Sequence, residues 1–215
     1  MNYNLAQIPE RTEKPRQKGL TMVMDKGLSL RQVEDFLEMG AAYTDIVKLG
    51  WATSYVTPNL KEKLAIYKSA GIPVYFGGTL FEAFYIRGQV DEYRRVLDQY
   101  GMEYAEVSDG SVDMESEVKC EFIRTLSQQV TVLSEVGSKD EAKIIPPYKW
   151  IKLMRMELEA GAWKVIGDER CRAIYGMSKH GEQSPYLSVQ GEVQHRKGPR
   201  WAEGRSGCCH EDVVR

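Results

Sequence analysis

This sequence of 215 residues lacks long apolar runs, and it lacks a GxGxxG signature. A membrane-spanning helix needs roughly 20 apolar residues, so the sequence predicts no such helix. The first 19 residues are polar and hold no apolar signal core, which predicts a cytoplasmic protein. Without GxGxxG after the first predicted strand, the main indicator of a dinucleotide-binding sheet is missing.

Cysteine is scarce and charge is balanced. The four cysteines include the adjacent pair Cys208 and Cys209, and no CxxC spacing occurs. This usage favours a reduced compartment over a disulfide framework or a zinc site. The formal net charge of −2 provides no general attraction to nucleic acid or membrane surfaces, so neither is predicted as a partner.

Strand-like and helix-like segments alternate between about residues 20 and 168. The predicted strands are 20–25, 45–51, 72–79, 103–110, 130–137 and 163–169, and the predicted helices are 29–43, 59–71, 80–101 with a break near Gly88, 115–129 and 146–161. This order is typical of a parallel sheet with crossover helices. An open doubly wound sheet and a closed barrel share the pattern. Polar residues within strands, such as Lys48 and Glu106, favour the barrel, because open parallel sheets are apolar on both faces.

The predicted fold class is therefore α/β of the (β/α)8 TIM-barrel type, with about six βα units recognisable. Residues 1–170 are predicted to form the barrel-like domain. Residues 171–215 contain scattered apolar residues, many glycines and several arginines, which predicts an irregular tail. Such a barrel would be incomplete. We consider three consequences of an incomplete barrel: poor folding, dimerisation through the open edges and weak substrate binding. The second would make the protein a homo-oligomer.

The carboxyl ends of the predicted strands carry polar residues. In order along the chain these are Asp25, Lys48, the turn Gly77–Gly78–Thr79, Glu106, Ser108, Asp109, Glu135, Lys139, Asp168 and Arg170. In a barrel these ends meet at one mouth, where carboxylates and lysines can hold Mg²⁺ and an anionic substrate. A strand-end carboxylate can equally be a helix cap, and the glycine turn can be either a tight turn or an anion site. A lysine inside an apolar strand requires a partner.

Six sequence motifs, which occur in order along the chain, carry more specific information than the periodicity of the sequence does. They are "KPRQKGLTMVMDKGL", "DIVKLGWATS", "YFGGTLFE", "AEVSDG", "LSEVGSK" and "GAWKVI". Over residues 10–170 the chain resembles the phosphosulfolactate synthase family. The resemblance implies a (β/α)8 barrel and a Mg²⁺-dependent carbon–sulfur lyase. It further implies addition of sulfite to phosphoenolpyruvate, giving (2R)-phospho-3-sulfolactate, as in coenzyme M biosynthesis or bacterial sulfolactate formation.

The resemblance also implies roles for individual residues. Lys139 is the expected general acid, with Glu135 beside it. The substrate-binding candidates are Lys14, Arg16, Lys48, Gly77, Gly78, Thr79, Ser108 and Arg170. The metal-binding candidates are Asp25, Glu106 and Asp109. Mg²⁺ next to the substrate carboxylate would stabilise the charge that builds there.

The family pattern weakens after residue 167. Asp168 and Arg170 stand where the family has a glutamate and an arginine, but Cys171 stands where the family has a second glutamate, and the motifs of the last two strands are missing. Two further hypotheses therefore stay open. One is a catalytically defective or non-enzymatic homologue of the stress-associated type. The other is an unrelated barrel enzyme acting on phosphoenolpyruvate or another phospho-acid.

Overall fold

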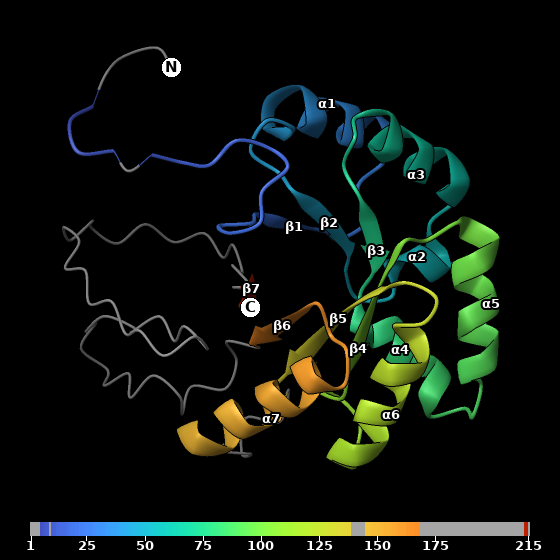
Figure 1. The fold of residues 1–215 in the computed structure, drawn as a ribbon. Helices are drawn as coiled ribbons and strands as arrows, with labels where there is room; N and C mark the ends of the chain where they lie inside the picture. Colours follow the sequence, from blue (N-terminus) through green and yellow to red (C-terminus); the bar gives the residue numbers. More distant parts are fainter. Residues whose placement is uncertain (1–4, 9, 139–144, 168–212, 215) are drawn as a thin grey trace, which may run out of the picture.

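The computed structural model describes residues 5–8, 10–138, 145–167 and 213–214. Its sheet has the neighbour order β1-β2-β3-β4-β5-β6-β7. The strands are β1 (Met22–Asp25), β2 (Ile46–Leu49), β3 (Val74–Phe76), β4 (Tyr104–Ser108), β5 (Thr131–Val136), β6 (Lys164–Gly167) and β7 (Val213–Val214). The first six pair in parallel, and β7 pairs antiparallel with β6. The predicted α/β barrel type is confirmed, in the form of a curled half-barrel with six parallel strands, five of which are followed by a helix within the described residues (Figure 1).

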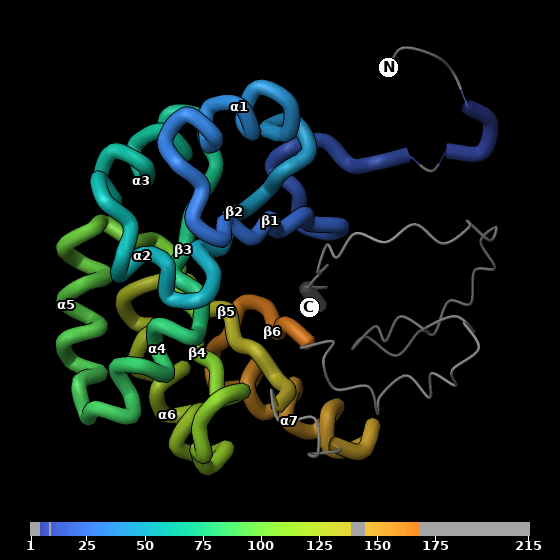
Figure 2. Tube along the Cα trace, turned by 180° about the vertical axis from the view of Figure 1, so that it is seen from behind, coloured from blue at the N-terminus to red at the C-terminus, as the bar shows by residue number. Residues whose placement is uncertain are grey.

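The helices follow the strands in the predicted alternation. They are α1 (Leu30–Gly40), α2 (Thr53–Val56), α3 (Leu60–Ser69), α4 (Gly78–Tyr85), α5 (Val90–Tyr100), α6 (Ser116–Leu126) and α7 (Pro147–Glu159). Seen from either side, they lie along one side of the sheet, from α1 and α3 at one end to α6 and α7 at the other (Figures 1 and 2). Within the described ranges, no helix has the length and apolar character that crossing a membrane requires.

Local sequence explains where most helices begin and end. Ser29 caps α1 in a capping box with Gln32, as its position predicts. The expected break between α4 and α5 occurs at Gly88, whose φ of +65° suits glycine. Proline at the first position begins α7. Asparagine is a common N-cap residue, but Asn59 at the N-cap of α3 has a left-handed backbone and its side chain makes no capping hydrogen bond.

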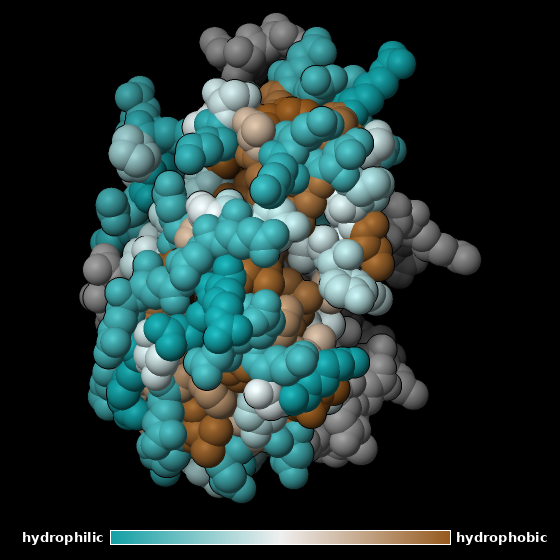
Figure 3. All heavy atoms as spheres, turned by 90° about the vertical axis from the view of Figure 1, so that its right-hand side faces the viewer, coloured by the Kyte–Doolittle hydropathy of each residue, from teal (hydrophilic) through white to brown (hydrophobic). Residues whose placement is uncertain are grey.

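The sheet has two faces with different partners. A small cluster of Ile46, Tyr75, Leu133 and Ile166 occupies the face that the helices do not cover, which we call the inner face. The larger apolar cluster fills the layer between the sheet and the helices, which we call the outer layer. Figure 3 shows the outside of the molecule on the side of α3 and α5, where hydrophilic side chains cover most of the surface and apolar ones show between them.

The tail prediction is mostly outside the described residues. Of the segment 171–215, the structure describes only β7, a two-residue strand that the sequence reading did not anticipate. The domain boundary near residue 170 stays a prediction.

Candidate active site

Three charged side chains meet on the inner face near the carboxyl ends of the strands. Lys48 of β2 lies opposite Tyr75, and Glu106 of β4 lies opposite Leu133, in the parallel ladders. Because partners in a parallel ladder point to the same side of the sheet, Lys48 and Glu106 share the inner face with these apolar residues. Glu135 lies two residues beyond Leu133 on β5, so it points the same way. Parallel pairing therefore places these charged side chains among the apolar residues of the inner face.

The Lys48 ammonium joins the two carboxylates of this inner-face group. Its Nζ lies 3.0 Å from Glu106 Oε1 and 3.0 Å from Glu135 Oε2. Lys48, Glu106 and Glu135 are 5%, 1% and 5% exposed. Removing such charges from water is costly unless they are paired, and here each carboxylate has an ammonium partner. The partner that the sequence demands for Lys48 is thus found.

The predicted glycine turn closes onto this cluster. The Gly78 N–H, at the start of α4, donates to Glu106 Oε1 at 2.7 Å. A Cβ on Gly78 would lie 2.3 Å from Ser108 Cβ, a separation that real side chains essentially never have. Gly77 is the N-cap of α4, and Thr79 lies in the first turn. The structure therefore brings the turn beside Glu106 and Ser108, and the anion that its N–H binds is a carboxylate of the chain.

Glu82 is a buried carboxylate that sequence reasoning missed. Its Oε1 accepts a short hydrogen bond from the Ser108 hydroxyl and another from the Ser111 N–H at 3.2 Å. Glu82 is 2% exposed, and Leu80 and Phe81 beside it on α4 are buried as well. The sequence feature that could have identified Glu82 is the presence of an acidic residue within an apolar helix. Glu82 ties α4 to the loop that follows β4.

Asp25 does not join the inner cluster. Its Oδ2 forms an ion pair with Lys63 Nζ at 2.7 Å and accepts from the Tyr67 hydroxyl at 3.0 Å, both from α3. Its Oδ1 accepts from the N–H groups of Gly27 and Leu28, each at 2.8 Å. Each of these partners is a group of the chain itself, so Asp25 anchors the end of β1 to α3.

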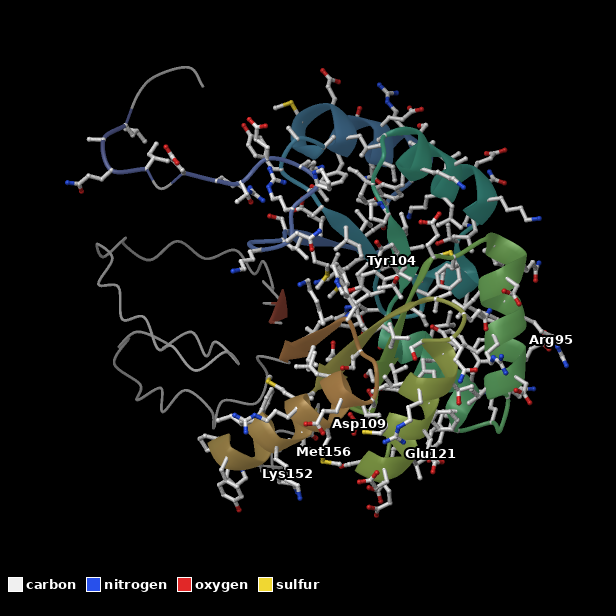
Figure 4. The ribbon with its side chains drawn as sticks, in the orientation of Figure 1. Arg95, Tyr104, Asp109, Glu121, Lys152 and Met156 are labelled. Atoms are coloured by element: carbon white, nitrogen blue, oxygen red, sulfur yellow. The ribbon has the colours of Figure 1, made fainter. Side chains whose placement is uncertain are left out.

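Asp109 lies in the outer layer as well. Its Oδ1 binds the ammonium of Lys119, from α6, at 2.8 Å. The same ammonium contacts Glu157 Oε1 at 2.8 Å and the backbone oxygen of Glu135 at 2.6 Å. Figure 4 shows Tyr104 and Asp109 at the two ends of β4, with Asp109 toward α6 and α7. Ser108 points to the inner face, whereas the side chain of Asp109, the next residue, points to the other side. The sheet therefore separates Asp109 from Glu106.

Burial shifts the pKa values of several groups around the site. Burial alone would lower the pKa of Lys119, but Glu157 and Asp109 more than offset it and raise that pKa above its ordinary value. Burial raises the pKa of Glu157, and Lys119 offsets this only in part. Burial and the nearby Glu106 raise the pKa of Tyr93 on α5, which stays a neutral phenol.

Lys14 and Arg16 lie at the opposite end of the strands. Arg16 forms an ion pair with Asp45 at 2.7 Å, and Asp45 immediately precedes β2. Lys14 Nζ donates to the backbone oxygen of Ala41 at 2.6 Å. The structure therefore does not bring these two predicted substrate-binding residues to the Lys48 cluster. They connect the N-terminal segment to the amino end of the sheet.

Lys164 is a second inner-face lysine that sequence reasoning missed. It lies opposite Leu133 in the ladder between β5 and β6, and it is 4% exposed. Its Nζ lies 4.7 Å from the centre of the Trp163 ring and 3.5 Å from the backbone oxygen of Gln17. Its signal was similar to that of Lys48, a lysine within an otherwise apolar strand.

The described carboxylates do not by themselves fit a magnesium site. In the part of the chain that the structure describes, no three His, Cys, Asp or Glu residues are grouped to hold a metal ion. Asp25, Glu106 and Asp109 are instead bound to three different lysines. Lys139 and Arg170 lie outside the described residues, as does Asp168. The Mg²⁺ requirement and the roles of these residues stay predictions.

A groove of about 660 Å³ opens at the other end of the sheet, between α3 and α5. Its lining includes Lys61, Ile72, Tyr100, Met102 and Tyr104. These residues lie at or near the amino ends of β3 and β4, so the groove is remote from the Lys48 cluster and takes no part in it.

Comparison with known proteins places the chain in a family. The family model described as (2R)-phospho-3-sulfolactate synthase (ComA) matches residues 9–188. The phosphosulfolactate synthase of Bacillus subtilis is 38% identical over 172 residues, covering 79% of this chain and 68% of that protein. That of Methanothermobacter thermautotrophicus is 38% identical over 167 residues, covering 75% and 65%. That of Methanocaldococcus jannaschii is 43% identical over 173 residues, covering 77% and 69%. On the family match and these three relatives, the chain belongs to the phosphosulfolactate synthase family, a lyase-type enzyme family.

Proposed function

We propose that this protein catalyses the Mg²⁺-dependent addition of sulfite to phosphoenolpyruvate, giving (2R)-phospho-3-sulfolactate, in the cytoplasm. Membership of the family supports the reaction. The observation that carries it within this chain is the buried Lys48–Glu106–Glu135 cluster on the inner face, near the strand ends where barrel active sites lie. The small anionic substrates match a site built around a fixed ammonium group.

The reaction forms one carbon–sulfur bond and one carbon–hydrogen bond. The sulfur lone pair of sulfite attacks the methylene carbon of phosphoenolpyruvate, and the electron pair of the carbon–carbon double bond moves toward the carboxylate. A proton then adds to the carbon that carries the phosphate. Mg²⁺, when bound, supplies positive charge beside the substrate carboxylate. Because the described carboxylates do not make up its ligand set, we assign no residue of the described chain to hold it.

We assign Lys48 to bind a carboxylate or phosphate oxygen of the substrate. Glu106 and Glu135 hold its ammonium in place from two strands, which fixes the position of the positive charge before substrate arrives. Lys139 is proposed as the proton donor on the resemblance alone. It follows Glu135 by four residues in the sequence, so the end of β5 would carry both.

The test of the function is sulfite-dependent loss of phosphoenolpyruvate absorbance, measured with purified protein. We expect turnover in the presence of Mg²⁺, its loss in EDTA and its recovery on adding Mg²⁺ back. Turnover that persists unchanged in EDTA after dialysis would reject the metal requirement. No sulfite-dependent consumption under any condition would reject the function.

Replacing the proposed acid gives a second, independent prediction. Lys139→Ala should lower kcat at least about 100-fold, since general acid catalysis typically contributes 10²–10⁴-fold. Lys152→Ala is the matched control, because Lys152 is an exposed lysine of α7 that points away from the sheet (Figure 4). Lys139→Ala with wild-type kcat would remove Lys139 from the chemistry.

A second candidate function is a catalytically defective or non-enzymatic homologue. It is favoured by β7, which pairs with β6 in the antiparallel direction, where a closed (β/α)8 barrel has another parallel strand. The same assay separates the two candidates. A folded protein that binds phosphoenolpyruvate but consumes none with sulfite would support this second reading.

A further inference from the structure

One ammonium in the outer layer connects the ends of two site-bearing strands. Lys119 of α6 is 1% exposed. Its Nζ lies 2.8 Å from Asp109 Oδ1, 2.8 Å from Glu157 Oε1 and 2.6 Å from the Glu135 backbone oxygen. A lysine ammonium has three N–H donors, and these three acceptors match them. The acceptors come from the loop after β4, from β5 and from α7.

Glu135 is held on both faces of the sheet. Its side chain reaches Lys48 on the inner face at 3.0 Å, and its backbone oxygen accepts from Lys119 in the outer layer at 2.6 Å. Glu135 is the fifth of the six residues of β5, so the Lys119 contact lies at the end of the strand. A backbone shift of about 1 Å there would carry the carboxylate out of contact with Lys48.

A second buried lysine illustrates a contact that only joins a helix to the end of a strand. Lys63, also 1% exposed, binds Asp25 and so holds α3 to the end of β1. None of the contacts of Asp25 described above involves Lys48. Lys119 differs because one of its acceptors belongs to the same residue whose side chain binds Lys48. The difference separates a contact that only stabilises the fold from one that also sets the geometry of the cluster.

We propose that Lys119 is a positioning residue, which acts through Glu135 and the ends of β4 and β5 to set the inner-face cluster. For its effect on turnover, the inference rests on the proposed function. Removing the ammonium releases the Glu135 backbone oxygen and Asp109 together. A misplacement of about 1 Å in a catalytic arrangement can cost on the order of 100-fold in rate.

The experiment must separate positioning from stability. Lys119→Met alone leaves Glu157 buried without its cation, which destabilises the fold. The double variant Lys119→Met/Glu157→Gln removes that charge, while Asp109 is partly open to water, with 23% of its side chain exposed. Ile123→Ala is the matched control, because it creates a cavity in the same helix and removes no charged or hydrogen-bonding group of the network.

Two measurements are made on each protein. Amide hydrogen exchange follows the peptides that contain residues 131–138 and 104–110, and the assay above gives kcat and KM. We expect the double variant to melt close to wild type, to exchange faster at the end of β5, and to lose about 10- to 100-fold in kcat with KM changed less than about threefold. Ile123→Ala should melt lower and keep kcat.

The two arms distinguish this inference from the proposed function. A wild-type protein without sulfite-dependent turnover would overturn the function, and exchange at the ends of β4 and β5 would still decide whether Lys119 holds them. Wild-type exchange in the double variant would overturn the inference. So would wild-type kcat in an active protein whose strand ends exchange faster, because the loosened strand ends would then have no effect on the site.

Discussion

Replacing Lys48 tests whether the inner-face cluster depends on its cation. Lys48→Met keeps the length of the side chain and removes the ammonium that lies 3.0 Å from each of two buried carboxylates. Breaking a buried ion pair by removing one partner costs about 3–5 kcal/mol. In a protein of this size, each kcal/mol lowers Tm by about 2–4 °C. We therefore expect Lys48→Met to melt about 6–20 °C below wild type at pH 7.

A rescue variant sharpens this prediction. Adding Glu106→Gln and Glu135→Gln should restore most of the Tm without restoring turnover. The exposed Lys152→Met should stay within about 0.5 kcal/mol of wild type. A Tm for Lys48→Met within 2 °C of wild type at pH 7 would correspond to a change of only about half of a kcal/mol in the free energy of unfolding. That result would show that the two carboxylates do not depend on the Lys48 ammonium as we argue.

The remaining predictions concern the glycine turn and high pH. Gly78→Ala should cost about 3 kcal/mol by overpacking against Ser108, whereas Gly88→Ala, with open space but a φ of +65°, should cost about 1 kcal/mol; equal denaturant midpoints would contradict the close approach. Burial raises the pKa of Tyr67 and Tyr93, with Asp25 and Glu106 adding to the respective shifts. Their contribution to stability is therefore complete below the ordinary pKa of about 10 and is lost above it, so unfolding and phenolate absorbance should rise together there. Phenolate absorbance rising fully before the fold is lost would refute this assignment.

Much of the inner face could be predicted from residue alternation. Residues two apart in a strand point to the same side, and the ladders place both Glu106 and Ser108 on the inner face. Lys48 was expected to need a partner and has two. The same alternation could have assigned Asp109 to the outer layer, since it follows Ser108 by one residue. The family resemblance had instead grouped Asp109 with Glu106 as a metal-binding candidate.

Other parts of the site had weaker signals in the sequence. β1 is apolar on both faces, so nothing in "LTMVMD" indicates on which side Asp25 ends. Lys119 precedes the buried Ile123 and Leu126 by four and seven residues, a helical spacing that puts it on the buried side of α6. Charge alone suggested a solvated residue. Its acceptor on β5 is a backbone oxygen, which has no signature in a sequence.

The three carboxylates first expected to hold a divalent ion are each bound to a lysine of the chain itself. A bound ion can dissociate, be diluted away or be removed by a chelator, whereas a covalently attached ammonium group cannot. The balance of charge at these strand ends is therefore built in when the chain is synthesised. The integrity of this part of the fold should not vary with the ionic composition of its surroundings, even where turnover does.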